Sequence, residues 1–176
     1  MAEEANQANA DLTFREIALG GPEFGMLIAE QRDGLVATGY TQEEADAMNT
    51  PGAFQATWIP GPMPMSVIGA DVEEKLVGWI FLLRRDDGTG ILESLWVRHG
   101  HRESGYGRKL VREAVARALS VGITTMEVHA MEREPKSVAF WEHLLQGPNA
   151  DDGILTINGQ RSTAKTWRLP TEKIAV

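Results

Sequence analysis

A short glycine-containing loop near the middle of the chain joins an apolar segment to an amphipathic helix, and this junction limits the folds that the chain can adopt. The apolar segment ends at Val97, and the loop runs from Arg102 to Gly107 with the spacing R-x-x-G-x-G. Apolar residues then recur at the spacing of one helical face. They are Leu110, Val111, Ala114, Val115, Ala118 and Leu119. This pattern predicts a strand, a loop and a helix that packs on a sheet.

The loop has the chemistry of an anion site. Gly105 and Gly107 allow close approach of the backbone to a ligand, and the N–H groups and dipole of the following helix favour phosphate oxygens. Arg102 adds a permanent positive charge. The P-loop pattern G-x-x-x-x-G-K-[ST] is absent from the sequence, and Leu110 stands where a dinucleotide fingerprint has its third glycine. A P-loop enzyme and a dinucleotide fold are therefore not indicated; a plain strand-to-helix connection is the structural alternative.

The order of these features resembles the acyl-CoA-binding segment of the GNAT superfamily of N-acyltransferases. A further strand is predicted from Thr124 to Ala130, and the chain then reads E-P-K-S-V-A-F-W-E-H-L-L from Glu134 to Leu145. This second segment is similar to the N-x-x-A-x-x-F-Y-E-x-L-G-F helix of that family. Two motifs in the expected order and separation, covering residues 91 to 145, are more specific than either motif alone.

The N-terminal third of the chain predicts a strand and two helices. Leu12 to Ile17 alternates apolar and polar residues as a strand does. A helix follows from Pro22 to about Gly39, and Thr41 with Glu44 forms a capping box for a second helix through about Met48. Prolines then predict a loop over Pro60 to Met65, which is either a lid over an acceptor pocket or an ordinary connector.

The remaining strands are separated by turn residues. Strands are predicted at Ser66 to Val72 and Lys75 to Arg84, joined by an acidic turn at Glu73-Glu74. Asp86-Asp87-Gly88 is the predicted turn before the strand that ends at Val97. Asn158-Gly159 predicts a hairpin that pairs Ile154 to Ile157 with Ala164 to Leu169.

The complete order is β-α-α-β-β-β-α-β-α-β-β. It matches the architecture that the resemblance implies, an α/β (α+β) fold with a mixed, largely antiparallel sheet of about seven strands and about four helices on its faces.

Composition supports one domain. The chain has 176 residues, 43% of them hydrophobic, and no cysteine, which excludes disulfides and a cysteine nucleophile and is compatible with a reducing compartment. We expect a disordered tail over residues 1–10, one domain over 11–170 and a C-terminal tail over 171–176. Residues 1–10 resemble neither a signal peptide nor an anchor, and no apolar run reaches the roughly 20 residues of a membrane span. A cytoplasmic protein without membrane contact is expected.

The net charge of −8 disfavours nucleic-acid binding, which depends on clustered Lys and Arg. It favours cationic partners, although solubility alone also explains it. His99 and His101 lack a third ligand at suitable spacing, so no metal site is predicted. His129 and His143 are expected to be structural, although either could reach the acceptor side.

The resemblance implies acetyl-CoA as cosubstrate. Its pantetheine arm would bind the main chain of the strand that ends at Val97, where that strand splays from the next, and its pyrophosphate would bind the loop N–H groups. The residues implied in coenzyme binding are Leu95, Trp96, Val97, Arg102, Glu103, Ser104, Gly105, Tyr106, Gly107, Arg108, Ser137 and Phe140. Core packing is the alternative for Phe140. Glu103 is an unusual neighbour for an anion and is expected to face solvent or pair with an arginine.

Acyl transfer to an alkyl ammonium requires that a proton leaves first, because the pKa of such an amine is near 10. Glu93 is the candidate base, acting directly or through water; a strand carboxylate paired with an arginine is the structural alternative. Backbone N–H groups near Val97 would polarise the thioester carbonyl.

Trp141 is the candidate at the acid position, but it stands where the family has a tyrosine, and an indole N–H cannot realistically transfer its proton. Glu134 likewise replaces an asparagine. Three alternatives stay open: the thiolate leaves without an acid, another group such as His143, Tyr106 or water serves, or acyl-CoA binds without turnover.

We therefore expect an acetyl-CoA-dependent N-acetyltransferase that acts on a small, cationic primary amine in a ternary complex. The alternatives are an acyl-CoA-binding regulatory protein with a degenerate site and an enzyme that acetylates a protein N-terminus or lysine. The sequence leaves a homodimer open.

Overall fold

A computed structural model describes residues 12–49, 65–146, 151–157 and 160–174. The strands are β1 (Leu12–Ile17), β2 (Met65–Val72), β3 (Lys75–Arg84), β4 (Gly90–Val97), β5 (Thr125–Met131), β6 (Asp151–Ile157) and β7 (Gln160–Pro170). The α-helices are α1 (Pro22–Ala37), α2 (Gln42–Asn49), α4 (Tyr106–Ser120) and α5 (Pro135–Leu144), and the 3-10 helices are η2 (His99–His101) and η3 (Thr171–Lys173). The predicted order of strands and α-helices is confirmed.

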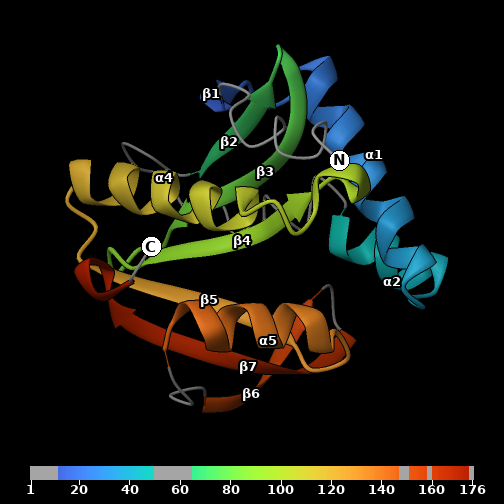
Figure 1. Cartoon of the computed structure of the whole chain (residues 1–176). Coiled ribbons are helices and arrows are strands. Elements are labelled where there is room, and N and C mark those ends of the chain that lie inside the picture. Colours follow the sequence, from blue (N-terminus) through green and yellow to red (C-terminus); the bar gives the residue numbers. More distant parts are fainter. Residues whose placement is uncertain (1–11, 50–64, 147–150, 158–159, 175–176) are drawn as a thin grey trace, which may run out of the picture.

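All seven strands form one sheet in the order β1-β2-β3-β4-β5-β7-β6 (Figure 1). Neighbouring strands are antiparallel except β4 and β5, which run parallel. A parallel pair needs a crossover connection, and α4 provides it. The predicted fold class, a mixed and largely antiparallel sheet with helices on its faces, is confirmed.

Two predicted turns contain left-handed residues, a conformation that glycine adopts readily and glutamate rarely. Glu73 and Glu74, between β2 and β3, have φ angles of 50° and 63°, as a two-residue hairpin turn with left-handed residues requires. Gly88, between β3 and β4, has a φ of 82°. These local signals therefore predicted both hairpins correctly.

The hairpin of β6 and β7 is present, but its predicted pairing is wrong. Ile154–Ile157 pairs with Gln160–Thr163, and Ala164–Thr166 pairs with Asp151–Gly153. A two-residue turn places its flanking residues opposite each other, so the register is counted from the turn and not from the apolar stretch. The turn residues 158–159 lie outside the described residues, as do residues 60–64 of the predicted proline loop.

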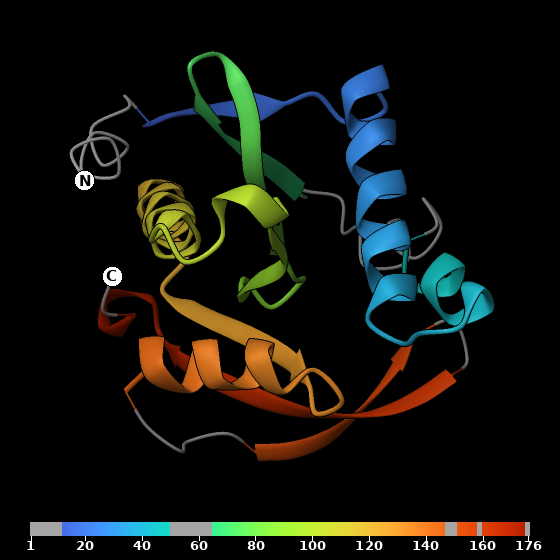
Figure 2. The same cartoon turned by 45° about the vertical axis from the view of Figure 1, so that its right-hand side comes forward.

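The helices divide between the two faces of the sheet (Figures 1 and 2). α4 and α5 cover one face and share the largest core with residues such as Ile80, Leu92 and Trp167. α1 packs on the other face, where Leu27 contacts a core that includes Trp79 and Phe81. A smaller apolar cluster joins α2 to the end of α1. Successive strand residues therefore alternate between two separate cores.

Tyr40 connects the α1–α2 segment to the start of α5. Its hydroxyl donates to Glu134 Oε1 at 2.6 Å, and the guanidinium of Arg133 covers its ring with Cζ 3.6 Å from the ring centre. Burial, followed by the bond to Glu134, raises the pKa of Tyr40. Arg133 Nη1 also donates to Glu44 Oε1 at 2.8 Å, and Glu44 forms the predicted capping box with Thr41. Glu134 is thus a structural partner of Tyr40.

Replacing Glu44 with Gln should remove a pH-dependent part of the stability. The bond from Arg133, helped by the backbone N–H of Thr41, lowers the pKa of Glu44 from 4.5 to about 2. The unfolded chain therefore binds this proton first, so the stabilisation is complete above pH 4.5 and is lost as the pH falls toward 2. Urea unfolding at pH 7 and pH 3 should show a smaller loss on acidification for Glu44→Gln than for the wild type. Glu43→Gln, one position earlier in α2, is the control; if it matches Glu44→Gln, the assignment is wrong.

The chain continues to pack beyond residue 170. Thr171 and Ile174 are both buried, and Ile174 belongs to the main core. The division into residues 1–10, 11–170 and 171–176 stays a prediction.

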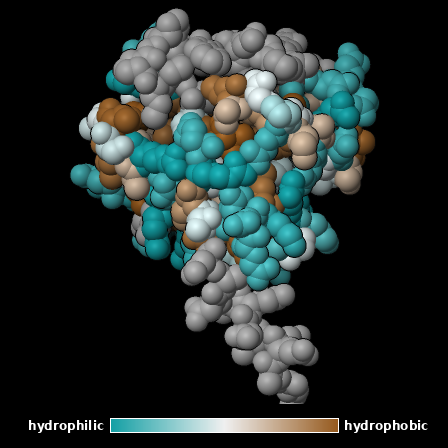
Figure 3. Space-filling model, turned by 90° about the horizontal axis from the view of Figure 1, so that it is seen from above, coloured by the Kyte–Doolittle hydropathy of each residue, from teal (hydrophilic) through white to brown (hydrophobic). Residues whose placement is uncertain are grey.

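Hydrophilic residues cover much of the face shown in Figure 3, with smaller hydrophobic areas between them. In the described residues, no helix is long and apolar enough to cross a membrane.

Candidate active site

A β-bulge interrupts β4 at the centre of the sheet. Trp79 of β3 lies opposite Trp96, but Phe81 lies opposite Glu93, so Ser94 and Leu95 together face a single residue of β3. Ser94 has a φ of 52°, in the left-handed region. The extra residue shifts the alternation of β4. As a result Trp96 joins the core under α1, whereas Leu95 and Val97 face α4.

β4 and β5 are hydrogen-bonded only at their beginning. Gly90–Leu92 pairs with Met126–Val128, and both strands then continue unpaired with each other; Figure 1 shows them diverging toward α1. The backbone N–H of Arg98 donates to Val77 O at 2.9 Å. Because backbone groups alternate in direction along a strand, the N–H and C=O of Val97 point away from β3, toward the gap. The divergence that the resemblance implied is therefore present.

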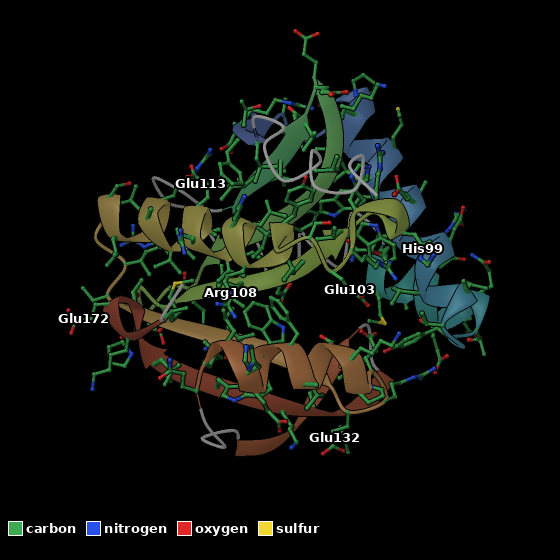
Figure 4. The ribbon with its side chains drawn as sticks, in the orientation of Figure 1. His99, Glu103, Arg108, Glu113, Glu132 and Glu172 are labelled. Atoms are coloured by element: carbon green, nitrogen blue, oxygen red, sulfur yellow. The ribbon has the colours of Figure 1, made fainter. Side chains whose placement is uncertain are left out.

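The N-terminus of α4 opens beside this gap. Gly105 has a φ of 78°, and no side chain caps the helix among the described residues. The first helical bond is from Lys109 N to Gly105 O, so the N–H groups of Tyr106, Gly107 and Arg108 have no acceptor within the helix. In Figure 4, Arg108 projects from α4 into the space above α5, and Glu103 lies below the loop. These features are those of an anion-binding helix end.

Gly78 of β3 allows the strand end and α4 to approach closely. A Cβ at this position would lie 2.7 Å from Trp96 O and 3.2 Å from Leu110 Cδ1. The absence of a side chain at Gly78 therefore helps to bring the end of β4 against the first turns of the helix.

The guanidinium of Arg102 lies on the end of β4. Its Nε donates to Val97 O at 2.9 Å, and its Cζ is 5.2 Å from the centre of the Trp96 ring. The side chain is exposed, as are Glu103, Ser104, Gly105 and Arg108. In this structure the Arg102 side chain therefore donates to the Val97 carbonyl, a main-chain group that was expected to bind the pantetheine arm.

The second motif meets the loop through Phe140. A Cβ at Gly107 would lie 3.5 Å from Phe140 Cε2. Ser137, one turn earlier on α5, is half-buried, and its N–H donates to Glu134 O at 2.9 Å. Trp141 is 4% exposed in the main core and meets Phe140 edge-on, with ring centres 5.1 Å apart. The side chain of Trp141 therefore packs in the main core.

Glu93 lies on the other face of the sheet, under α1. It follows Ile91 in the alternation of β4 and pairs with Phe81, and both of these residues belong to the core under α1. Burial raises the pKa of Glu93, and the charge of Arg85 opposes that rise. Glu93 and Trp141, the two residues predicted to be catalytic, therefore lie on opposite faces of the sheet.

A network on the face of Glu93 was missed in the sequence. Glu127 is 6% exposed, and Arg85 Nη1 donates to its Oε2 at 3.1 Å. His129 lies between Glu127, 2.8 Å from Nε2, and Thr166, 2.9 Å from Nδ1. Burial lowers the pKa of His129, whereas Arg85 lowers the pKa of Glu127 against the opposing effect of burial. The sequence does carry a signal for this network, because Glu127 and His129 lie two positions apart in a mainly apolar strand.

The network and Glu93 are close in register. Ile91 pairs with Glu127, so Glu93 and His129, each two residues further, lie on neighbouring strands at the level where these begin to diverge. Among the described residues, no group of three His, Asp or Glu side chains has the geometry of a metal site.

A mixed sheet whose parallel strands diverge at a bulge, beside an uncapped helix N-terminus, sets an open strand end next to an anion-binding helix end. A sequence model of the Acetyltransferase (GNAT) family matches residues 32–145. The chain belongs to this family, and it is an enzyme of the GNAT N-acetyltransferase type.

Solved structures share the fold at low sequence identity. The PaiA N-acetyltransferase of Thermoplasma acidophilum, in complex with coenzyme A, is 14% identical with a TM-score of 0.61, and the match covers 88% of this chain and 98% of that one. A chimera of the spermidine N-acetyltransferase SpeG of Vibrio cholerae and hSSAT is 16% identical with a TM-score of 0.62, covering 93% and 97%. The ribosomal-protein-S18-alanine N-acetyltransferase of Escherichia coli is 14% identical with a TM-score of 0.59, covering 94% and 96%. No curated protein sequence matches the chain.

Proposed function

We propose that the chain transfers the acetyl group of acetyl-CoA to a primary amine, in a ternary complex. The observation that carries the proposal is the coincidence of three features at the end of β4: the bulge at Ser94, the divergence from β5 and the uncapped N-terminus of α4. An extended ligand with a negatively charged end would find main-chain partners in the gap and N–H groups at the helix.

The residues present fit coenzyme A. The N–H groups of Tyr106, Gly107 and Arg108 are available to the pyrophosphate, and the space beside Gly105 is open. The indole N–H of Trp96, beside the bulge, is buried without an acceptor in the described part of the chain. Arg102, which now donates to Val97 O, would turn outward to the phosphates when pantetheine takes that carbonyl. Leu95, Phe140 and Ser137 would border the arm.

Glu93 would accept the amine proton. Bound acetyl-CoA would supply a thioester carbonyl as the electrophile. The raised pKa of Glu93 makes the carboxylate a better proton acceptor than an exposed glutamate. Backbone N–H groups of the bulged segment would polarise the carbonyl without needing a particular side chain.

The proposed acceptor is a small cationic amine. The net charge of −8 would attract it, and one structural neighbour is a spermidine acetyltransferase. Because another neighbour acetylates a ribosomal protein, a peptide panel belongs in the same screen.

With no cysteine in the sequence and an intracellular cosubstrate, we propose a cytoplasmic location.

Burial of Trp141 in the core supports a second candidate, an acyl-CoA-binding protein without turnover. An indole in this position supplies no acid for the thiolate. The two candidates separate in an assay that measures release of the coenzyme thiol with amines and peptides. Release above the rate of hydrolysis supports the transferase, and tight binding of acetyl-CoA without release supports the second candidate.

Acetyl-CoA should raise the melting temperature of the wild type, and Gly105→Glu should abolish this rise. A ligand that binds only the folded state stabilises it, and a carboxylate at Gly105 would repel phosphates at the helix end. Gly122→Glu is the matched control, because Gly122 also has a φ of 78° and open space around its Cβ position, but lies beyond the other end of α4. Differential scanning fluorimetry with and without millimolar acetyl-CoA measures both. If the two variants respond alike, the coenzyme does not bind at Gly105.

A further inference from the structure

Gln31 places a buried side-chain amide of α1 directly over the bulge of β4. The residue is 9% exposed. Its Oε1 accepts a hydrogen bond from Trp79 Nε1 at 3.2 Å, and its Nε2 donates to Ser94 Oγ at 3.1 Å. An indole nitrogen can only donate, so Trp79 determines which end of the amide carries the oxygen. The nitrogen is thereby directed to Ser94.

Ser94 has an unfavourable backbone conformation within β4. Its φ of 52° lies in the region that residues other than glycine rarely adopt. This angle makes the bulge, and the bulge turns the following backbone so that the groups of Val97 face the gap toward β5. A bond to the Ser94 side chain therefore acts on the orientation of the whole segment Leu95–Val97.

The other buried residues of α1 are apolar. Leu27 and Leu35, one turn to either side on α1, are buried. At Gly34 the helix has no side chain, and the Trp96 ring fills that space while stacking on Trp79 with ring centres 6.0 Å apart. Burying an amide among such residues is costly unless its bonds are made. An aliphatic residue would fill this position more simply if packing were its only task.

We propose that Gln31 is a positioning residue for acetyl transfer: by holding Ser94, it keeps the main chain of Leu95–Val97 in the geometry that receives the thioester. This inference rests on the proposed function, because it assigns Gln31 a part in that same reaction. Gln31 acts through Ser94 and the backbone and contacts neither substrate.

The test compares Gln31→Met, Ser94→Ala and the double variant in a double-mutant cycle on kcat. Each single variant removes the same hydrogen bond from one end, so each should lower kcat about 10- to 100-fold, the size expected for a small misplacement of reacting groups. The double variant should lose no more than the worse single variant. KM for acetyl-CoA should change much less than kcat, because the pyrophosphate loop is unaltered and only the contact of the thioester carbonyl is weakened.

A stability control separates positioning from packing. Leu27→Ala removes a fully buried side chain from the same face of α1 and should lower the melting temperature at least as much as Gln31→Met. It should leave kcat within about twofold, since the bond to Ser94 is intact. If Leu27→Ala lowers kcat as much as Gln31→Met, Gln31 is a packing residue and the inference is wrong.

Binding gives a second readout that needs no acceptor. Acetyl-CoA offers a thioester carbonyl to the bulged segment and coenzyme A does not, so Gln31→Met should weaken acetyl-CoA more than coenzyme A in calorimetric titrations. If the wild type binds acetyl-CoA but acetylates nothing, the proposed function fails, and the inference, which rests on it, fails with it. Unchanged kcat and an unchanged ratio would overturn the inference and leave the proposed function standing. A wild type that binds no acetyl-CoA overturns both.

Discussion

Glu93→Gln is expected to lower kcat by about 100- to 10,000-fold, the range for loss of a general base, and to unfold at a higher temperature than the wild type. An amide cannot accept the amine proton, which explains the loss of activity. Burial raises the pKa of Glu93, so the folded protein holds this proton more tightly than the unfolded chain does. The stability linked to protonated Glu93 is complete below the ordinary pKa of 4.5 and is lost as the pH rises through the raised value. At neutral pH the ionised carboxylate therefore destabilises the fold, and Gln removes that cost.

The sign of the change in stability separates the two interpretations of Glu93. A carboxylate retained for an ion pair would make Glu93→Gln less stable, whereas a buried base makes it more stable. Glu172→Gln is the control: Glu172 lies at the end of the molecule opposite His99 in Figure 4 and should affect neither quantity. Fluorimetry at pH 5 and pH 8 should show a larger gain in melting temperature at the higher pH. A variant that stays fully active would remove Glu93 from the mechanism.

Gly34→Ala is expected to destabilise the fold by about 1 to 3 kcal/mol or more, the cost of overpacking a core. A Cβ at Gly34 would overlap Cη2 of Trp96 and lie 2.6 Å from its Cζ2. The ring cannot easily move away, because it stacks on Trp79, which is fully buried. The loss should appear in urea unfolding at pH 7. Since Trp96 adjoins the bulge, weaker acetyl-CoA binding should accompany it.

Gly25→Ala is a control in the same helix. Nothing lies within 4 Å of a Cβ at Gly25, so alanine should stabilise α1 by about 0.5 to 1 kcal/mol through its helix propensity. Trp96→Phe combined with Gly34→Ala should recover part of the lost stability because the smaller ring leaves room. Equal effects at Gly25 and Gly34 would mean that the overlap with Trp96 is relieved elsewhere.

Much of the element order could be predicted because its signals act locally. Thr41 and Glu44 cap α2 through bonds that span three residues, and Gly88 readily adopts the left-handed φ of the turn before β4. The family resemblance depended on the loop at Arg102–Gly107 and the segment from Glu134, whose spacing is visible in the sequence. Neither the element order nor the family resemblance required knowledge of tertiary contacts.

The bulge and the polar network could not be predicted in the same way. The bond from Gln31 to Ser94 joins residues 63 positions apart, and the bond from Arg85 to Glu127 joins residues 42 apart. Leu92 and Leu95 in the sequence break the period-two alternation, which is the trace that a bulge leaves. The pairing error in the last hairpin had a different origin, because its register is counted from the two-residue turn and apolar residues alone do not determine it.

The bond between Tyr40 and Glu134 has a consequence for the order of folding. It joins residues 94 positions apart, and closing such a long loop costs chain entropy before any contact compensates for it. The α1–α2 segment gains this anchor only when β5 and the start of α5 exist. During synthesis, therefore, we expect the α1–α2 segment to complete its docking only after residue 134 has left the ribosome.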